Sequence, residues 1–189
     1  MRVVVAFESM YGHTRLVAQA VADGFGGDDV AVIPISELDR ETLDAVDVLV
    51  VGSPTHTHGL PRVGTRKVAI EAAHTPGDDQ TVDPSASFSG VREWLATLPE
   101  GMDVKVATFD TRFRPPAWLT GHPARHVARV MRRHGADLLA HSASFHVDHH
   151  EQLRAGELDR ARQWGRRLGE RARSTCPADS ARPPAQRGS

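Results

Sequence analysis

Two hydroxyl side chains and a glycine stand where an apolar run meets a helical pattern near the start of the sequence. Ser9, Gly12 and Thr14 follow the run Val3-Val4-Val5-Ala6, within the stretch 8–14 that we call loop one. The first N–H groups of a helix have no acceptor inside the helix, and the helix dipole favours an anion there. Gly12 permits a tight backbone around an oxyanion, and the hydroxyls add donors. Taken alone, this pattern predicts either an anion cradle or a helix-entry turn.

Two further loops follow apolar runs and are long enough to form walls of the same slot. Loop two is GSPTHTHG, residues 52–59, and loop three is DTRFRPPAWLTG, residues 110–121. Other anion-binding motifs do not fit, since G-x-G-x-x-G is missing after the first apolar run and Gly-Lys-Ser/Thr occurs nowhere. Gly52-Ser53 stands where a phosphoacceptor receiver domain would need an aspartate.

The elements that position these loops alternate between strands and helices. Short apolar, β-branched runs predict strands, and apolar spacings of three and four predict amphipathic helices. The predicted strands are 2–7, 30–35, 48–52, 104–109 and 138–147, and the predicted helices are 13–25, 38–46, 91–98, 123–134 and a last helix that begins near 158. A helix opening is expected over 62–73, and the polar segment 74–90 is expected to be a long mobile loop.

Alternation of this kind predicts an α/β fold, in which a parallel sheet carries helices on both faces. Ligands of such sheets bind at the carboxyl ends of the strands, near the point where the strand order reverses. All three loops follow predicted strands, so we expect them to meet at that edge. We expect one domain over 1–173 and a disordered tail over 174–189, because the tail is rich in Pro, Ser, Ala and Arg.

The loops also carry a resemblance to a known family. The stretch Ser9-Met10-Tyr11-Gly12-His13-Thr14 resembles the FMN-phosphate loop of the flavodoxins, with hydroxyls and a glycine at the same spacing. VVGSPTHTHGLP resembles the flavodoxin loop that lies along one side of the isoalloxazine ring. TFDTR and the distal GELDRARQWG resemble a subgroup of actinobacterial flavodoxin-domain proteins. The resemblance covers roughly residues 2–170.

This resemblance implies a flavodoxin-like three-layer sandwich, with a five-stranded parallel sheet in the order 2-1-3-4-5 and FMN bound without a covalent link. The implied cofactor-binding residues are Ser9, Met10, Tyr11, Gly12, His13 and Thr14 from loop one, Pro54, Thr55, His56, Thr57, His58 and Gly59 from loop two, and Asp110, Thr111, Arg112 and Phe113 from loop three. No residue is a convincing acid or base, so no catalytic set is named.

The implied function is redox chemistry, either electron transfer to a partner protein or reduction of a small acceptor such as a quinone. Two alternatives stay open: an NAD(P)H-dependent FMN oxidoreductase, and a non-enzymatic partner-binding or sensor module with a degenerate flavin site. Departures from the family concern the ring end, where His56 and His58 stand in place of an expected aromatic residue. Four cations stand near the three loops in sequence: Arg62, Arg66, Arg112 and Arg114. Their charge would stabilise an anionic reduced flavin.

Histidine pairs raise the question of a metal site. His56 and His58 alternate on an extended segment and therefore point the same way, and VDHH at 147–150 adds two more histidines. A third ligand at a fixed spacing is missing, so we expect no metal.

Asp110 and Arg112 have three interpretations: pairing with each other, capping the next turn, or touching the flavin ring.

Composition limits the cellular setting and the partners. The chain has 189 residues, with 23 Lys and Arg against 24 Asp and Glu, a balance that argues against nucleic-acid binding. A single cysteine, Cys176, is typical of a reducing compartment. No signal-like segment opens the chain and no apolar run approaches a membrane span, so we expect a cytoplasmic protein without membrane contact. A homo-oligomer is left open.

Overall fold

The strands at the centre of the parallel sheet are largely apolar and buried on both faces, whereas the strands at its edges are partly exposed. The computed structural model describes residues 1–27, 29–55, 60–61, 64, 83, 86, 89–113, 122–148 and 152–175. The strands are β1 (Val3–Phe7), β2 (Val30–Pro34), β3 (Val48–Pro54), β4 (Lys105–Phe113), β5 (Asp137–Leu138) and β6 (Ala143–Val147). Their order is β2-β1-β3-β4-β5, with β6 also paired to β4, and every pairing is parallel. The predicted strand order is confirmed.

The predicted fifth strand is divided in two. Strand β5 pairs with the start of β4 through Lys105, and β6 pairs with its end from Phe109 onward. Between the two pieces, Thr108 Oγ1 lies 2.7 Å from Ser142 Oγ and donates to the carbonyl oxygen of Ala124 at 2.9 Å. The contact with Ser142 lies in the gap between β5 and β6, so the two pieces form one interrupted edge of the sheet.

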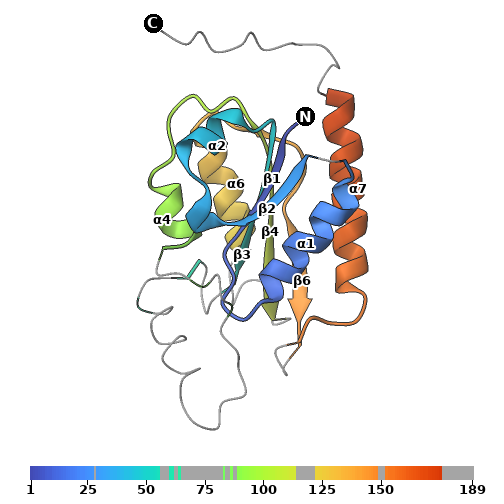
Figure 1. The fold of residues 1–189 in the computed structure, drawn as a ribbon. Coiled ribbons are helices and arrows are strands. Elements are labelled where there is room, and N and C mark those ends of the chain that lie inside the picture. The colour runs from blue at the N-terminus through green and yellow to red at the C-terminus, as the bar shows by residue number, and fades with distance from the viewer. Residues whose placement is uncertain are drawn as a thin grey trace, which may run out of the picture.

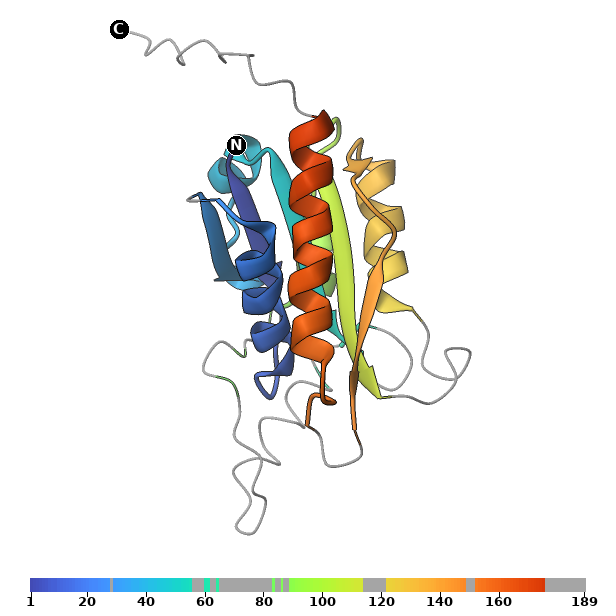
Figure 2. The same ribbon diagram turned by 90° about the vertical axis from the view of Figure 1, so that its right-hand side faces the viewer.

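One face of the sheet is covered by two long helices that lie side by side, α1 (His13–Phe25) and α7 (Glu157–Thr175) (Figure 2). Glycines make their close approach feasible. A Cβ on Gly24 would lie 1.9 Å from the carbonyl oxygen of Arg162, and one on Gly165 would lie 2.1 Å from that of Val21. Because α1 packs so tightly against α7, its N-terminus and the loop before it have a fixed place at the edge of the sheet.

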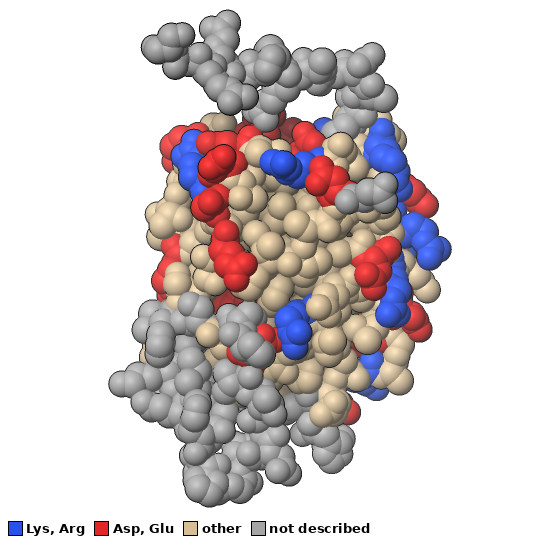
Figure 3. Space-filling model, in the orientation of Figure 1, with Lys and Arg blue, Asp and Glu red and all other residues tan. Residues whose placement is uncertain are grey.

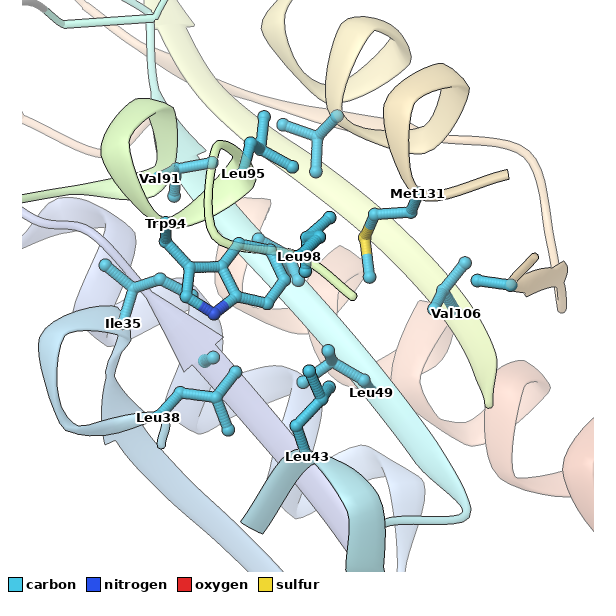
Figure 4. Packing of buried hydrophobic residues seen from close by; sticks show 14 of the residues in the cluster. Ile35, Leu38, Leu43, Leu49, Val91, Trp94, Leu95, Leu98, Val106 and Met131 are labelled. Carbon is cyan, nitrogen blue, oxygen red and sulfur yellow. The ribbon is translucent and has the colours of Figure 1, made fainter. Parts of the chain in front are cut away.

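The opposite face carries the shorter helices α2 (Arg40–Ala45), α4 (Val91–Leu95) and α6 (Pro123–Arg133), with a 3-10 turn, η1 (Ile35–Glu37). Figure 4 shows their shared core, in which the Trp94 ring lies among side chains from the sheet and the neighbouring helices, with Leu98 and Met131 beside it. Figure 1 shows the three layers that result and confirms the predicted sandwich.

Several boundaries differ from the prediction. Strand β4 runs on to Phe113 instead of ending at residue 109, and α4 ends at Leu95 instead of residue 98. Of the helix opening expected over 62–73 only residue 64 is described, and most of 74–90 and of the tail 174–189 lie outside the described residues. Within the described ranges, none of the helices combines the length with the apolar character that a membrane span requires.

Candidate functional site

The carboxyl ends of three adjacent strands bring the predicted site together. Strand β1 is paired to β3 up to Phe7 opposite Gly52, and β3 is paired to β4 up to Pro54 opposite Thr111. Loop one, the start of loop two and the end of β4 therefore meet at one edge, the lower one in Figure 1. The sheet geometry predicted this meeting, because parallel strands end on the same side.

Loop one is a tight turn that leads into α1. Gly12 is the N-cap of the helix and has a φ of 87°, in the left-handed region that favours glycine. Ser9 is buried, and its Oγ accepts a hydrogen bond from the Gly12 N–H at 3.0 Å. The Ser9 hydroxyl therefore holds the turn, while the first N–H groups of α1 point away from any acceptor within the helix.

A pair of threonines ties loop one to β4. Thr14 Oγ1 and Thr111 Oγ1 are 2.8 Å apart, and both residues are buried. The Thr111 carbonyl oxygen also accepts from the Thr55 N–H at 2.8 Å, which joins the start of loop two to the same point. The three predicted walls are thus fastened together by residues that the sequence placed in the site.

Three buried polar atoms at this edge have no hydrogen-bond partner within the described residues. They are Ser53 Oγ, Thr55 Oγ1 and Asp110 Oδ1. Ser53 and Asp110 lie opposite each other in the β3–β4 register, and their exposed fractions are 0% and 1%. Buried polar groups are almost always paired in folded proteins, so three orphan atoms on two neighbouring strands indicate a place for a polar ligand or for water.

Asp110 is shielded from water, which disfavours its charge. Burial raises the pKa of Asp110, and the Ser144 hydroxyl, the Ala124 N–H and the Arg112 guanidinium oppose that shift. Its Oδ2 accepts from the Ala124 N–H at 3.2 Å. The shift leaves the carboxyl more readily protonated than an ordinary aspartate.

A buried guanidinium stands next to this carboxyl on β4. Arg112 is 6% exposed, and its Nη1 lies 3.3 Å from Nδ1 of His122, the residue just before α6. Burial lowers the pKa of His122, and the charges of Arg125 and Arg112 lower it further. A neutral His122 can accept a hydrogen bond from Arg112 at Nδ1, so the pair carries a single positive charge.

The residues predicted for loop three belong mostly to the sheet. Asp110, Thr111 and Arg112 are buried positions of β4, and Phe113 is 42% exposed at its end. Of the two other segments, Met10 is buried, whereas Tyr11, His13, Pro54 and Thr55 are half-buried. His56, Thr57, His58 and Gly59, on which the predicted ring contacts of loop two depend, lie outside the described residues.

Two acidic residues of the site were missed by sequence reasoning. Glu8 is buried directly after β1, where its Oε2 accepts from the Val91 N–H at 2.9 Å at the start of α4. Asp83 is 4% exposed, donates its N–H to the Met10 carbonyl oxygen at 2.8 Å, and accepts from Arg15 Nε at 2.9 Å. Glu8 could have been suspected as a charge at a strand end. Nothing in the polar stretch around Asp83 indicates that it packs against loop one.

The surface charges give no sign of a single-signed docking face in the view of Figure 3. Basic and acidic residues are interspersed along α7, as in the Arg162–Asp159 pair at 2.9 Å, and the middle of this face is uncharged. Across the described residues, no group of three or more His, Cys, Asp or Glu side chains is arranged to hold a metal ion.

Comparisons with known proteins bear on the fold and on the first half of the chain. The family model described as Flavodoxin matches residues 5–92, a range that begins in β1 and ends in α4. A search of curated proteins finds no match in sequence.

Solved structures of flavodoxins resemble the chain over nearly their whole length. An archaeal flavodoxin aligns with a TM-score of 0.59 at 18% identity, covering 91% of this chain and 99% of its own. Flavodoxin 1 from Bacillus cereus gives 0.61 at 14% identity, with 90% and 98% covered. A flavodoxin, WrbA-like protein from Agrobacterium tumefaciens gives 0.57 at 20% identity, with 92% and 98% covered. The shared architecture shows that this chain has a flavodoxin-like fold, and the family model matches that fold over residues 5–92.

Proposed function

We propose that the chain binds FMN at the carboxyl ends of β1, β3 and β4 and acts as a redox protein. The reaction would be electron transfer to a partner protein or reduction of a small acceptor such as a quinone. The flavin supplies the electron chemistry when bound, and the protein binds, orients and tunes it. The flavodoxin family match supports the proposal, since the matched range 5–92 includes loop one, β3 and loop two.

The residues present fit both ends of such a cofactor. At the phosphate end, Gly12 forms a tight turn and the N-terminus of α1 after it offers backbone N–H groups, a setting that favours oxyanions. At the ring end, the orphan atoms of Ser53, Thr55 and Asp110 offer polar partners to a heterocycle edge. These three buried atoms, which lack a partner among the described residues, are the observation that carries the proposal, because a folded protein rarely leaves such groups without a hydrogen-bond partner.

Arg112 is the residue proposed to tune the flavin. Its charge is buried at the end of β4, beside a carboxyl whose pKa is raised. A guanidinium in this position stabilises negative charge on the reduced flavin, so Arg112→Gln should make the two-electron midpoint potential more negative, by about 30 mV for each 1.4 kcal/mol lost. Arg112→Lys keeps the charge and serves as the control. An unchanged potential in Arg112→Gln would remove Arg112 from this role.

The first test of the proposed function is a visible absorption spectrum. Purified protein should carry a flavin absorption band or should acquire one on addition of FMN, and titration should quench the fluorescence of free FMN at a 1:1 ratio. A colourless protein that ignores added FMN refutes flavin binding and favours the non-enzymatic module. Steady oxidation of NADH or NADPH by the holoprotein would instead identify an NAD(P)H-dependent oxidoreductase, whereas a carrier would not turn over without a partner.

A further inference from the structure

A buried carboxylate lies beside the turn that is proposed to hold the FMN phosphate. The Asp83 side chain is 1% exposed, and its Oδ2 accepts a hydrogen bond from Arg15 Nε at 2.9 Å. Its backbone N–H donates to the Met10 carbonyl oxygen at 2.8 Å, which joins Asp83 to the middle of loop one. Asp83 is therefore part of the wall of loop one, although it lies 68 residues beyond Arg15 in the sequence.

The same carboxylate borders the open side of the glycine. A Cβ built on Gly12 would find Asp83 Oδ2 at 3.6 Å and Arg15 Nη2 at 3.9 Å as its nearest neighbours. The atom closest to this space is thus an oxygen that carries negative charge, and the cation that balances it stands slightly farther away.

Electrostatics makes this arrangement unfavourable for a second anion. The N-terminus of α1 favours negative charge, and the Asp83 carboxylate already lies in that field. A phosphate dianion at loop one would feel repulsion from a carboxylate that is shielded from water. The Arg15 side chain is 41% exposed, so solvent screens its compensating charge more strongly.

We propose that Asp83 is a specificity-determining residue, which weakens the binding of a dianionic phosphate at loop one and so sets how strongly the chain prefers FMN to riboflavin. The inference rests on the proposed function, because it assigns a role to Asp83 at the same site. With Asp83 in place, the preference for FMN over riboflavin should be smaller than with an uncharged residue at this position.

The test compares two flavins that differ only in the phosphate. Asp83→Asn keeps the size of the side chain, an oxygen that can accept from Arg15, and the backbone N–H that bonds Met10. We expect FMN to bind about tenfold more tightly to this variant, or better, while riboflavin binding stays unchanged. Fluorescence quenching of each flavin gives both dissociation constants.

A matched control is present at the other end of the sheet. Asp44 pairs with Arg40 Nε at the same 2.9 Å, on the exposed surface of α2. Asp44→Asn removes the same charge far from loop one and should alter neither flavin affinity. Arg15→Gln is the second variant: it removes the Arg15–Asp83 ion pair, so FMN should bind more weakly while riboflavin is unaffected. If Asp83→Asn does not fold, an FMN affinity of Arg15→Gln equal to that of wild type overturns the role of Asp83.

The outcomes separate this inference from the proposed function. Parallel changes of FMN and riboflavin affinity in Asp83→Asn, or no change of either, overturn the role of Asp83 while flavin binding stands. If neither flavin binds the wild-type chain, inorganic phosphate replaces them as the probe in thermal denaturation. Greater stabilisation of Asp83→Asn than of wild type by phosphate then supports the role of Asp83 although the proposed function has failed, and equal or absent stabilisation overturns both.

Discussion

Gly12 offers the most direct perturbation of the proposed phosphate end. Its φ of 87° lies in the left-handed region, where an L-residue costs roughly 1–2 kcal/mol. The nearest atom to a Cβ would be Asp83 Oδ2 at 3.6 Å, an ordinary contact, so sterics add little to the folding cost of Gly12→Ala. We expect the free energy of unfolding to fall by about 1–2 kcal/mol and Tm by about 2–8 °C.

Gly101 is the matched control for this variant. It has a φ of 70°, a Cβ added to it would find no atom within 4 Å, and it precedes β4 at the opposite end of the sheet. Gly101→Ala should lose a similar amount of stability in urea denaturation. Only Gly12→Ala should also weaken FMN, by about tenfold or 1.4 kcal/mol, because its methyl group narrows the turn around the phosphate. The reasoning is refuted if Gly12→Ala unfolds like wild type, or if it binds FMN as tightly as Gly101→Ala.

Three further predictions test the packing and the charges that support the site. Gly165→Ala places a methyl 2.1 Å from a carbonyl oxygen of α1 and should cost about 2–3 kcal/mol in denaturation, whereas Gln163→Ala on the exposed side of α7 should stay within about 0.5 kcal/mol. Thr14→Val and Thr111→Val should each lower the free energy of unfolding by about 1–3 kcal/mol, because each leaves the partner's buried hydroxyl unpaired. The double variant should lose clearly less than the sum of the two, and additive losses would show that the two hydroxyls do not interact. Burial raises the pKa of Asp110, so the folded state holds this proton to higher pH than the unfolded state does, and the contribution of Asp110 to stability falls as pH rises above about 4. Asp110→Asn should remove that contribution from the pH dependence of the free energy of unfolding in urea, and an unchanged pH dependence would contradict it.

The strands and the first helix could be predicted because local pattern and tertiary setting agree. Val3–Phe7 is apolar without interruption, as a central strand of a parallel sheet must be, and α1 has the predicted bounds, His13–Phe25. Gly12 and Gly26 at its two ends explain this agreement, since both have a positive φ that favours glycine at a helix boundary.

The end of β4 could not be predicted in the same way. Asp110, Thr111 and Arg112 are polar and precede two prolines, a pattern typical of a loop, and the predicted strand therefore stopped at residue 109. In the structure Asp110 and Thr111 are paired with β3 on one side and with β6 on the other, and Arg112 is paired with β6. Pairing on both edges is a tertiary effect that overrides a weak local preference, and a single sequence does not carry it.

The structure also changes which residues of loop one can report on a ligand. Sequence reasoning assigned the Ser9 and Thr14 hydroxyls to the phosphate, yet Ser9 Oγ holds the Gly12 N–H and Thr14 Oγ1 bonds Thr111. Substitution of either hydroxyl therefore changes the shape of the turn as well as any contact with an anion, and a loss of affinity would not distinguish the two. Gly12 and Asp83 border the open side of the turn, and each has a control elsewhere in the chain. Recognition at this end is therefore best tested through backbone conformation and charge.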